Sequence, residues 1–385
     1  MELNINRDFI KEVLIQLVQT DSRNPSMVAD APGEGNIGSI LADLMREMGL
    51  EVSTIELAPD RVNVVGMLPG TGMGRSLILN GHMDTVGVDE MEDPFSGFIE
   101  DGRLYGRGSQ DMKGSLAAML GSIKALVDGG VTLAGDVIVT AVADEENQSL
   151  GTIELVKSLK ADAAIVTEPT DLQVVSAHRG WNWYEVEVEG KAAHGSRFQD
   201  GKDAIFLMGR FLVELEKFSE ELIQREGHPL TGPPSIHTSL IEGGSDMCTY
   251  PPRCTVSIER RTVSGESELQ VTREIQMIIN KLMEEDQDYS AKLTLIAERS
   301  ALDTDLDSGV MRALKEAYQN QQGKPAQITG AAYWTDAALL AEAGMESVLI
   351  GPVGEGLHSA VEWVELESVY DLAEILAETA VLYCK

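Results

Sequence analysis

Short apolar runs alternate with helix-like segments along most of the chain, and this alternation restricts the possible folds more than any other feature. Helical spacing of apolar residues covers 8–19, 37–48, 113–127 and 151–159. The apolar runs lie at 62–67, 76–80, 136–143 and 163–166. Strands that are apolar on both faces and alternate with helices are typical of a parallel sheet covered on both sides. The alternation therefore predicts an α/β domain with a mostly parallel central sheet.

The pattern changes near residue 179. Residues 181–190, WNWYEVEVEG, alternate between apolar and polar types, as a half-exposed strand does. Further elements are predicted in the order helix, strand, strand, helix, strand, near 202–217, 236–241, 254–260, 266–283 and 291–296. This βαββαβ order predicts a small two-layer α+β sandwich of the ferredoxin-like type. The α/β pattern then resumes, so we predict one domain at 1–178 and 292–385, interrupted by an inserted domain at 179–291.

The bulk composition limits the partners and the location of the protein. Its formal net charge of −33 opposes binding to nucleic acid phosphates and to anionic membranes, so we expect neither partner. The first residues, MELNINRDFIKEV, lack the basic and apolar regions of a signal peptide, and no apolar stretch reaches the ~18 residues of a membrane span. The three cysteines show no paired spacing, which favours a reducing cytoplasm.

His82 follows an apolar run in SLILNGHMD, and Asp84 comes two residues later. Ligand sites in open α/β sheets lie at the carboxyl ends of strands, so His82 is well placed to bind a metal. A carboxylate at Asp84 would orient the imidazole ring of a metal-bound histidine. A single histidine at a strand end is also common as a hydrogen-bonded structural residue, so this pair alone leaves both interpretations open.

Acidic side chains and a second histidine follow other predicted elements. Asp111 lies in the glycine-flanked loop GRGSQDMKG, where a helix N-cap is the alternative to a ligand. Glu145 and Glu146 follow an apolar run, and adjacent carboxylates repel one another unless a cation lies among them or water solvates the loop. Glu168 follows the apolar run at 163–166, and His358 lies in a glycine-rich loop that follows a further apolar run at 347–350.

Taken together, five predicted sheet strands each lead to a histidine, an aspartate or a glutamate. Two imidazoles and three carboxylates, with one carboxylate shared, can bind two zinc ions through three protein ligands each. Such a set leaves room for a bridging water, which is typical of a catalytic metal site. The sequence does not distinguish zinc from cobalt or manganese as the bound metal.

Several motifs are together similar to the signatures of one enzyme family. In chain order they are GHMDTV, GRGSQDMKG, DEE, EP, GKAAHGS and HSAVE. They resemble the acetylornithine deacetylase, succinyl-diaminopimelate desuccinylase and glutamate carboxypeptidase family of two-zinc amidohydrolases, from about residue 8 to the C-terminus. The resemblance implies that the metal ligands are His82, Asp111, Glu146, Glu168 and His358. It also implies that Asp111 bridges the two ions, that Glu145 is the general base and that Asp84 orients a ligand.

The same resemblance gives the inserted domain a role, because in the family this domain acts as a lid and commonly forms a homodimer. The segment GKAAHGSRFQDGKDAI matches the lid motif, which implies that His194 stabilises the oxyanion, often in the partner subunit's site. The segment SIERRTVSGE implies that Arg261 binds the substrate carboxylate, although Glu259 and Ser264 stand where the family has Asp and Pro. By sequence alone, His194 is a loop histidine and Arg261 a surface arginine at a strand end.

The expected function is hydrolysis of the amide bond of a small N-acyl amino acid, with Glu145 as general base. N-acetylornithine or a related N-acetyl amino acid is the expected substrate, because a glutamate at the position of Glu168 accompanies deacylases and carboxypeptidases in this family. Desuccinylation of succinyl-diaminopimelate and a glutamate-type carboxypeptidase activity are alternatives. A succinyl substrate needs a second cation, for which the candidates are Arg179, Arg197 and Arg253. A catalytically silent metal-binding protein is an alternative of another class.

The segment PGTGMG at 69–74 has alternating glycines, but it opens no helix and lacks the Lys-Ser/Thr of a phosphate-binding loop. We therefore predict no nucleotide site there. Because the segment lies between two apolar runs, we predict that it forms a hairpin turn.

Overall fold

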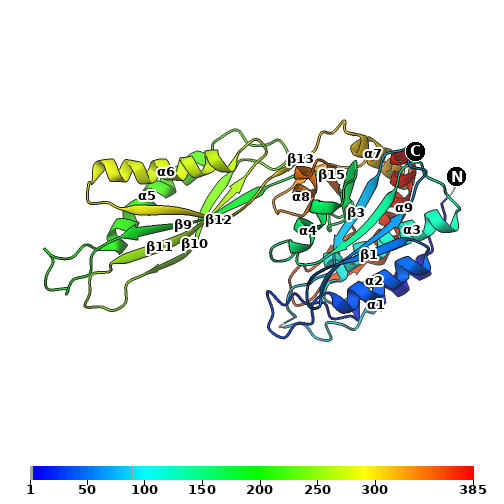
Figure 1. The fold of residues 1–385 in the computed structure, drawn as a ribbon, viewed down its shortest axis with the longest axis horizontal. Helices are drawn as coiled ribbons and strands as arrows, with labels where there is room; N and C mark the ends of the chain where they lie inside the picture. Colours follow the sequence, from blue (N-terminus) through cyan, green and yellow to red (C-terminus); the bar gives the residue numbers. More distant parts are fainter. Residues whose placement is uncertain (1–2, 89) are drawn as a thin grey trace. The chain divides into compact units, whose positions relative to one another are not determined.

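The computed structural model describes residues 3–88 and 90–385 (Figure 1). The chain forms two compact units. The bounds of unit 1 are Met1–Ser176, Thr304–Thr329 and Thr335–Lys385, and those of unit 2 are Ala177–Asp303 and Gly330–Trp334. Unit 2 is therefore inserted into unit 1, close to the change of pattern near residue 179.

A mostly parallel sheet forms the centre of unit 1. Its strands in spatial order are β1 (Glu51–Ala58), β2 (Arg61–Leu68), β6 (Val137–Val142), β3 (Leu77–His82), β7 (Ala163–Val166), β15 (Glu346–Leu349) and β8 (Val174–His178), with β14 (Ile328–Ala331) also paired to β8. The middle strands β6, β3, β7 and β15 run parallel, whereas β1, β2 and β8 pair antiparallel with their neighbours. Every residue of β3, β6 and β7 is buried, which explains their apolar sequences and confirms the predicted α/β domain.

Helices cover both faces of this sheet. Their bounds are α1 (Arg7–Val18), α2 (Gly35–Glu47), α3 (Gly114–Asp128), α4 (Leu150–Ser158), α7 (Gly309–Gln322), α8 (Ala337–Glu342) and α9 (Leu366–Tyr383). Figure 1 shows α4 and α8 on one side of the sheet and α1, α2, α3 and α9 on the other. Helix α3 is buried along most of its length because it packs against the sheet, α1 and α9.

A second, small sheet in unit 1 joins segments that are far apart in the sequence. Its strands in spatial order are β16 (Gly354–Glu355), β17 (Trp363–Glu365), β5 (Arg103–Tyr105) and β4 (Phe98–Glu100). Strand β17 pairs antiparallel with both β16 and β5. This pairing brings the loop between β16 and β17, which carries His358, to the segment that follows β5, which carries Asp111.

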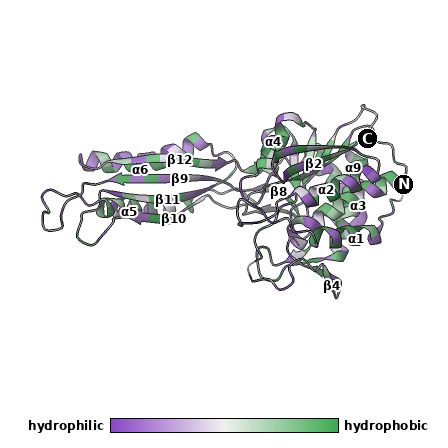
Figure 2. Ribbon diagram, turned by 60° about the horizontal axis from the view of Figure 1, so that its bottom comes forward, coloured by the Kyte–Doolittle hydropathy of each residue, from purple (hydrophilic) through white to green (hydrophobic). Residues whose placement is uncertain are grey.

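Unit 2 is a two-layer sandwich. Its elements in chain order are β9 (Gly180–Glu189), α5 (Ala204–Leu222), β10 (Ser235–Gly243), β11 (Arg253–Thr262), α6 (Glu268–Glu285) and β12 (Ala291–Arg299). The short strand β13 (Leu302–Asp303) lies outside this sandwich and pairs antiparallel with β8 at Ala177 and His178. The sheet order is β10-β11-β9-β12, and the alternating hydropathy of β9 and β11 is visible in Figure 2. The buried side chains of these two strands pack with those of α5 and α6 in one core. The predicted βαββαβ order is confirmed, and the insertion extends past residue 291 because β12 belongs to its sheet.

The predicted hairpin turn at 69–74 is wrong. The strands on either side of this segment, β2 and β3, do not pair with each other, because β6 lies between them and pairs with both. The segment therefore passes over the end of β6. A side chain at Gly70 or Gly74 would collide with the backbone of Gly135 in this passage, which explains the glycines.

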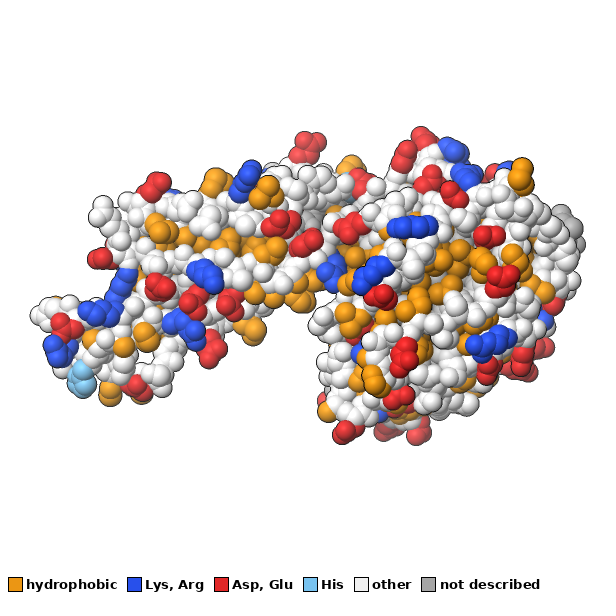
Figure 3. Space-filling view, in the orientation of Figure 1, with side chains coloured by type: hydrophobic (Ala, Val, Ile, Leu, Met, Phe, Trp, Pro, Cys, Tyr) orange, Lys and Arg blue, Asp and Glu red, His pale blue; other side chains and the backbone are white. Residues whose placement is uncertain are grey.

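Carboxylates are spread over the surface of the protein. Figure 3 shows Asp and Glu side chains across the visible face of both units, with Lys and Arg side chains among them. On this face the acidic side chains are therefore dispersed and do not form a single patch. In the part of the chain that the structure describes, no helix is long and apolar enough to cross a membrane.

Candidate metal centre

Three loops at one edge of the central sheet carry candidate ligands. Strands β6, β3 and β7 are parallel neighbours, so their carboxyl ends meet at the same edge. Strand β3 ends at His82, and Glu168 follows β7 by two residues. Glu145 and Glu146 lie in the loop after β6. The adjacency of these strands explains how residues from distant parts of the sequence come together.

Asp111 reaches the same place from a different direction. It follows β5 of the small sheet, so the expectation that five strands of the central sheet lead to ligands is wrong for this residue. Asp111 lies in the short turn Ser109–Lys113, and the peptide bond that follows it is cis. The N-cap residue of α3 is Lys113, so the alternative that Asp111 caps this helix does not hold.

The two carboxylate oxygens of Asp111 face two different histidines. Oδ1 lies 3.0 Å from Nε2 of His82, and Oδ2 lies 3.5 Å from Nε2 of His358. His358 Nε2 is also 3.0 Å from Oε2 of Glu146. On the other side, His82 Nε2 is 3.8 Å from Oε1 of Glu168. A tetrahedral metal ion about 2.1 Å from its ligands holds them about 3.4 Å apart, so these spacings fit two ions that share the Asp111 carboxylate.

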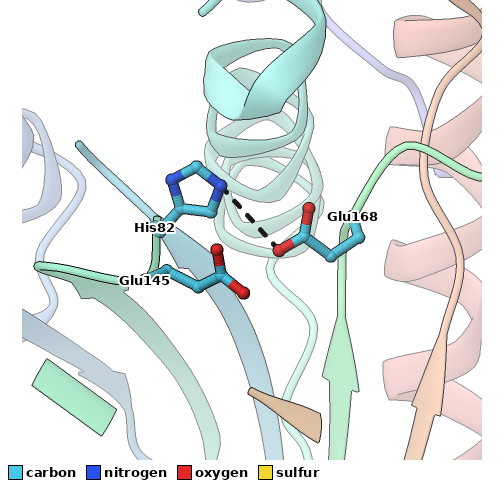
Figure 4. Close-up of side chains that lie close together, drawn as sticks. All are labelled: His82, Glu145 and Glu168. Atoms are coloured by element: carbon cyan, nitrogen blue, oxygen red, sulfur yellow. Dashed lines mark ion pairs between the residues drawn. The ribbon is translucent and has the colours of Figure 1, made fainter. Parts of the chain in front are cut away.

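Glu145 lies beside His82 and Glu168, and Figure 4 shows its carboxylate directed toward both side chains. One ligand atom from each of these three residues lies within 4.8 Å of the other two. The same holds for a second group, His82, Asp111 and Glu146. A carboxylate in the position of Glu145 can reach a water molecule held between these groups, as a general base must.

The carboxylates of the centre are crowded and removed from water. Burial raises the pKa of Glu168 to about 8, and burial together with the charge of Glu168 raises the pKa of Glu145 well above its ordinary value. The hydrogen bonds with Asp111 and Glu146 raise the pKa of His358 to about 10. Among the residues that the structure describes, Oε1 of Glu168 is buried and has no hydrogen-bond partner. Divalent cations would relieve this repulsion and give Glu168 a partner, so the donor set fits metal ions.

Asp84 is buried and contacts both the His82 ring and the loop that carries Glu145 and Glu146. Its backbone carbonyl oxygen lies 2.9 Å from Nδ1 of His82, whereas its carboxylate oxygen Oδ1 lies 3.7 Å away. An Nδ1–H donated to this carbonyl leaves Nε2 unprotonated for a metal. The carboxylate accepts hydrogen bonds from the backbone N–H groups of Glu145, at 3.1 Å, and Glu146, at 3.2 Å. The short contact with His82 is therefore made by the backbone of Asp84, and its carboxylate holds the loop that carries Glu145 and Glu146.

Glu362 holds the Asp111 loop, a role that the sequence did not reveal. Its carboxylate accepts hydrogen bonds from the backbone N–H groups of Gly108, Gln110 and Asp111, at 3.0, 3.0 and 3.1 Å. The same loop that carries His358 thus also fixes a second candidate ligand. The four-residue spacing from His358 to Glu362 was visible in the sequence, but it does not identify partners about 250 residues earlier.

Asp336 is a further buried carboxylate near the centre that sequence reasoning did not assign. It directly precedes α8 and accepts a hydrogen bond from the hydroxyl of Thr152 at 2.5 Å. Burial raises the pKa of Asp336 from 3.8 to about 6.

We expect Asp336→Asn to remove one component of the pH dependence of the unfolding free energy of the metal-free protein. The folded pKa of Asp336 exceeds the ordinary value of 3.8, so the folded state binds the proton more tightly than the unfolded state does. The resulting stability is fully present below pH 3.8 and is lost as the pH rises through 6, by up to about 3 kcal/mol. Urea unfolding between about pH 4 and pH 6.5 measures this difference, and a wild-type-to-variant gap independent of pH would contradict it.

His194 and Arg261 both lie in unit 2. His194 is exposed in the loop between β9 and α5, with Nδ1 2.8 Å from the hydroxyl of Ser196. Arg261 lies on β11, where Nη1 is 3.2 Å from the Glu259 carboxylate and Nη2 donates to the carbonyl oxygen of Ala332. These contacts are those of a loop histidine and a strand arginine, so their roles toward a substrate stay predictions.

The sequence and the fold are similar to those of known enzymes. A sequence model of the peptidase family M20/M25/M40 matches residues 78–381. The chain is 31% identical to an acetylornithine deacetylase from Myxococcus xanthus over 332 residues. This alignment covers 84% of this chain and 85% of that protein. It is 28% identical to an N-formyl-4-amino-5-aminomethyl-2-methylpyrimidine deformylase from Bacillus subtilis strain 168 over 406 residues. That alignment covers 97% of this chain and 95% of the deformylase.

The fold is also similar to that of a solved structure from Bacillus subtilis, the YXEP protein, which is described as a dinuclear metal-binding peptidase. The two chains share a TM-score of 0.77 at 14% sequence identity, over 98% of each chain. At this level of identity the similarity concerns the arrangement of helices and strands.

Proposed function

The chain belongs to the peptidase family M20/M25/M40, and we propose that it is a two-metal amidohydrolase that cleaves the amide bond of an N-acyl amino acid. The observation that carries this proposal is the position of Asp111, whose two oxygens face His82 and His358. A carboxylate shared between two sets of ligands is the arrangement that a two-metal hydrolase requires. The similarity to a dinuclear metal-binding peptidase supports the same assignment.

We assign the ligands to two sets with Asp111 in common. His82, Asp111 and Glu168 would hold one ion, and Asp111, Glu146 and His358 would hold the other. Imidazole and carboxylate ligands suit zinc, and cobalt or manganese can occupy the same ligands. Such ions, when bound, polarise an amide carbonyl and lower the pKa of a water molecule.

Glu145 would carry the proton between the two halves of the reaction. Its carboxylate lies beside His82 and Glu168, and its raised pKa suits a group that accepts and then returns a proton. It would take a proton from the attacking water as the oxygen adds to the amide carbonyl. It would then give that proton to the amine nitrogen as the C–N bond breaks. The products are a carboxylic acid and a free amine.

We propose that His194 stabilises the developing oxyanion and that Arg261 binds the substrate carboxylate, on the strength of the lid motifs. We expect Arg261→Lys to raise KM about tenfold and to change kcat less, because lysine keeps the charge but loses the planar fork that binds a carboxylate through two hydrogen bonds. Steady-state kinetics with an N-acetyl amino acid and with its C-terminal amide tests this. An equal loss on both substrates would remove Arg261 from carboxylate binding.

The substrate that we favour is N-acetylornithine or a related N-acetyl amino acid. The similarity to an acetylornithine deacetylase over most of both chains supports this choice. Succinyl-diaminopimelate and glutamate-type peptide substrates are the runners-up, because they present the same amide next to a carboxylate.

A formylated aminopyrimidine is the second candidate substrate, and an aromatic face in unit 2 favours it. The indole rings of Trp181 and Trp183 stack with centroids 4.2 Å apart, and Arg261 is the residue opposite Trp181 on β11. Stacked aromatic rings with a neighbouring guanidinium can bind a planar heterocycle. The similarity to a pyrimidine deformylase spans almost the whole chain, which supports the same candidate.

The release of free amine by the zinc- or cobalt-reconstituted protein tests the proposal. The panel holds N-acetylornithine, N-acetyl-lysine, N-acetylcitrulline, succinyl-diaminopimelate, several dipeptides and the formylated aminopyrimidine. Preference for one N-acetyl amino acid would support the deacetylase proposal. Turnover of the formylated aminopyrimidine alone would support the proposed metal centre and contradict the proposed N-acetyl amino acid substrate. Two bound metals with no turnover on any of these compounds would favour a catalytically silent metal-binding protein.

We also propose that the protein forms a homodimer through unit 2. β10 is an edge strand of the sheet, and Leu240 and Ile241 on it are 71% and 59% exposed. Unpaired edge strands with exposed apolar side chains readily pair with another chain. We expect the double variant Leu240→Glu, Ile241→Glu to be monomeric in light scattering. The matched control is Ile296→Glu on β12 at the opposite edge, and a dimer that survives the β10 change would contradict the proposal.

A cytoplasmic location is proposed on the basis of the cysteines. Cys248, Cys254 and Cys384 are all free thiols in the described part of the chain. Three unpaired thiols are typical of proteins that function in a reducing compartment.

A further inference from the structure

A buried polar network lies beneath the loop that carries Glu145 and Glu146. Three carboxylates, those of Glu34, Asp84 and Asp144, belong to it, and each of these residues is 0% exposed. The guanidinium of Arg61, on β2, lies among them, and its side chain is 10% exposed. Buried carboxylates need a cation or several hydrogen-bond donors, so Arg61 is the group that makes this arrangement tolerable.

Every nitrogen of the Arg61 guanidinium is used within this network. Nε and Nη2 donate to the two carboxylate oxygens of Glu34, at 2.5 and 2.9 Å. Nη2 also donates to Oδ1 of Asp144 at 2.8 Å, and Nη1 donates to the hydroxyl of Ser26 at 3.1 Å. Glu34 therefore fixes the plane of the guanidinium, and the fixed guanidinium holds Asp144.

Asp144 is the residue that turns the chain after β6. Its φ of 69° lies in the left-handed region, which aspartate tolerates better than most residues. Its carbonyl oxygen accepts hydrogen bonds from the N–H groups of Asn147, Gln148 and Ser149, at 3.3, 3.1 and 2.6 Å. The path of the loop, and with it the direction of Glu145 next in sequence, therefore depends on how Asp144 is held.

Asn24 connects Asp144 to Asp84. Its side-chain Nδ2 donates to Oδ2 of Asp84 at 2.8 Å and to Oδ1 of Asp144 at 3.0 Å, so both amide hydrogens are used. Asp84 in turn accepts the backbone N–H groups of Glu145 and Glu146. The turn residue and the two following amides are thus tied to the same set of buried groups.

We propose that Arg61 is a positioning residue for the metal centre: by holding Asp144 directly, and Asp84 through Asp144 and Asn24, it places Glu145 for proton transfer and Glu146 for metal binding. This inference rests on the proposed metal centre. Arg61 acts through other residues, since its guanidinium nitrogens bind Glu34, Asp144 and Ser26. Lysine cannot replace it, because one ammonium nitrogen cannot take the places of Nε and Nη2, which bind the two carboxylates, and of Nη1, which binds Ser26.

The test uses cobalt-reconstituted full-length protein and three variants, Arg61→Lys, Arg61→Met and Asp144→Asn. We expect each variant to bind cobalt about tenfold or more weakly, as changes to groups that orient metal ligands do. We also expect an altered visible absorption spectrum of the bound cobalt, and a lower kcat with little change in KM. The asparagine variant keeps the side-chain size and the left-handed backbone and removes only the charge, so it remains informative if the methionine variant does not fold.

Arg260→Met is the matched control, because Arg260 is also fully buried and ion-paired, with Glu266 in unit 2. It should lower Tm without changing cobalt affinity or the cobalt spectrum. Arg61 and Asp144 variants that lower Tm but bind cobalt with wild-type affinity, spectrum and kcat would overturn the inference and leave the metal centre intact. A wild-type protein that binds no cobalt and no zinc would refute the proposed metal centre, and the inference with it.

Discussion

Glu145→Gln should lower kcat by about a thousandfold while the protein keeps its bound metals. Glutamine has the same size as glutamate and makes the same backbone contacts, including the hydrogen bond from its N–H to Asp84. It cannot accept the proton of the attacking water. Because Glu145 belongs to neither of the two proposed ligand sets, its charge is not needed to hold an ion. Turnover of the best substrate and metal content by mass spectrometry measure the two effects on the same sample.

The neighbouring residue supplies the control for this prediction. Glu146 contacts His358 at 3.0 Å and belongs to the second ligand set, so Glu146→Gln should weaken metal binding as well as turnover. Two adjacent glutamates would then give different results from the same substitution. Loss of metal from the Glu145 variant would instead make Glu145 a ligand, and substantial remaining turnover would assign the proton transfer to another group.

The order of helices and strands, and the edge of the sheet where the site lies, could be predicted from local patterns. The apolar runs that form β3, β6 and β7 are buried on both faces. A strand buried on both faces needs apolar residues at nearly every position, so it can be recognised from its residue types alone. His82 and Glu168 could be recognised because each comes just after such a run. In unit 2 the alternation of apolar and polar residues along β9 reflects a sheet with one covered face. This alternation, together with the order of helices and strands, predicted the two-layer sandwich.

The pairing of strands could not be predicted, because it depends on contacts between distant segments. Residues 69–74 have the composition of a turn, and only the insertion of β6 between β2 and β3 makes them a crossing connection. The small sheet is a similar case. Its pairing of β5 with β17 brings Asp111 to His358, and neither short strand shows a periodicity that identifies its partner.

The supporting groups of the site were also beyond local patterns, because a charged residue is normally expected at the surface. Arg61 and Glu362 are both buried, and each is stabilised by partners that are remote in the sequence. The Arg61 partners Glu34 and Asp144 lie 27 and 83 residues away. The chemistry of the ligands is thus visible in the sequence, whereas the groups that hold the ligands become visible only in the folded chain.

Asp111→Ala should abolish activity and remove both metal ions, which is a larger effect than the loss of any other single ligand. Each of the other ligands belongs to one proposed set, whereas Asp111 belongs to both, through Oδ1 toward His82 and Oδ2 toward His358. Metal ions contribute several kcal/mol of transition-state stabilisation, and each 1.4 kcal/mol is a factor of ten, so turnover should fall by about 10³-fold or more.

Thermal unfolding with and without added zinc gives an independent measure, because an ion that binds only the folded state raises its stability. The wild type should gain Tm with zinc, and the Asp111→Ala protein should gain little. Glu168→Ala is the comparison, since it removes a ligand of one set and leaves His358, Glu146 and Asp111 for the other ion. We expect that variant to retain about one ion per chain and part of the Tm gain. If Asp111→Ala also retained one ion, the two sets would not share this carboxylate, and the bridging assignment would have to move to another residue.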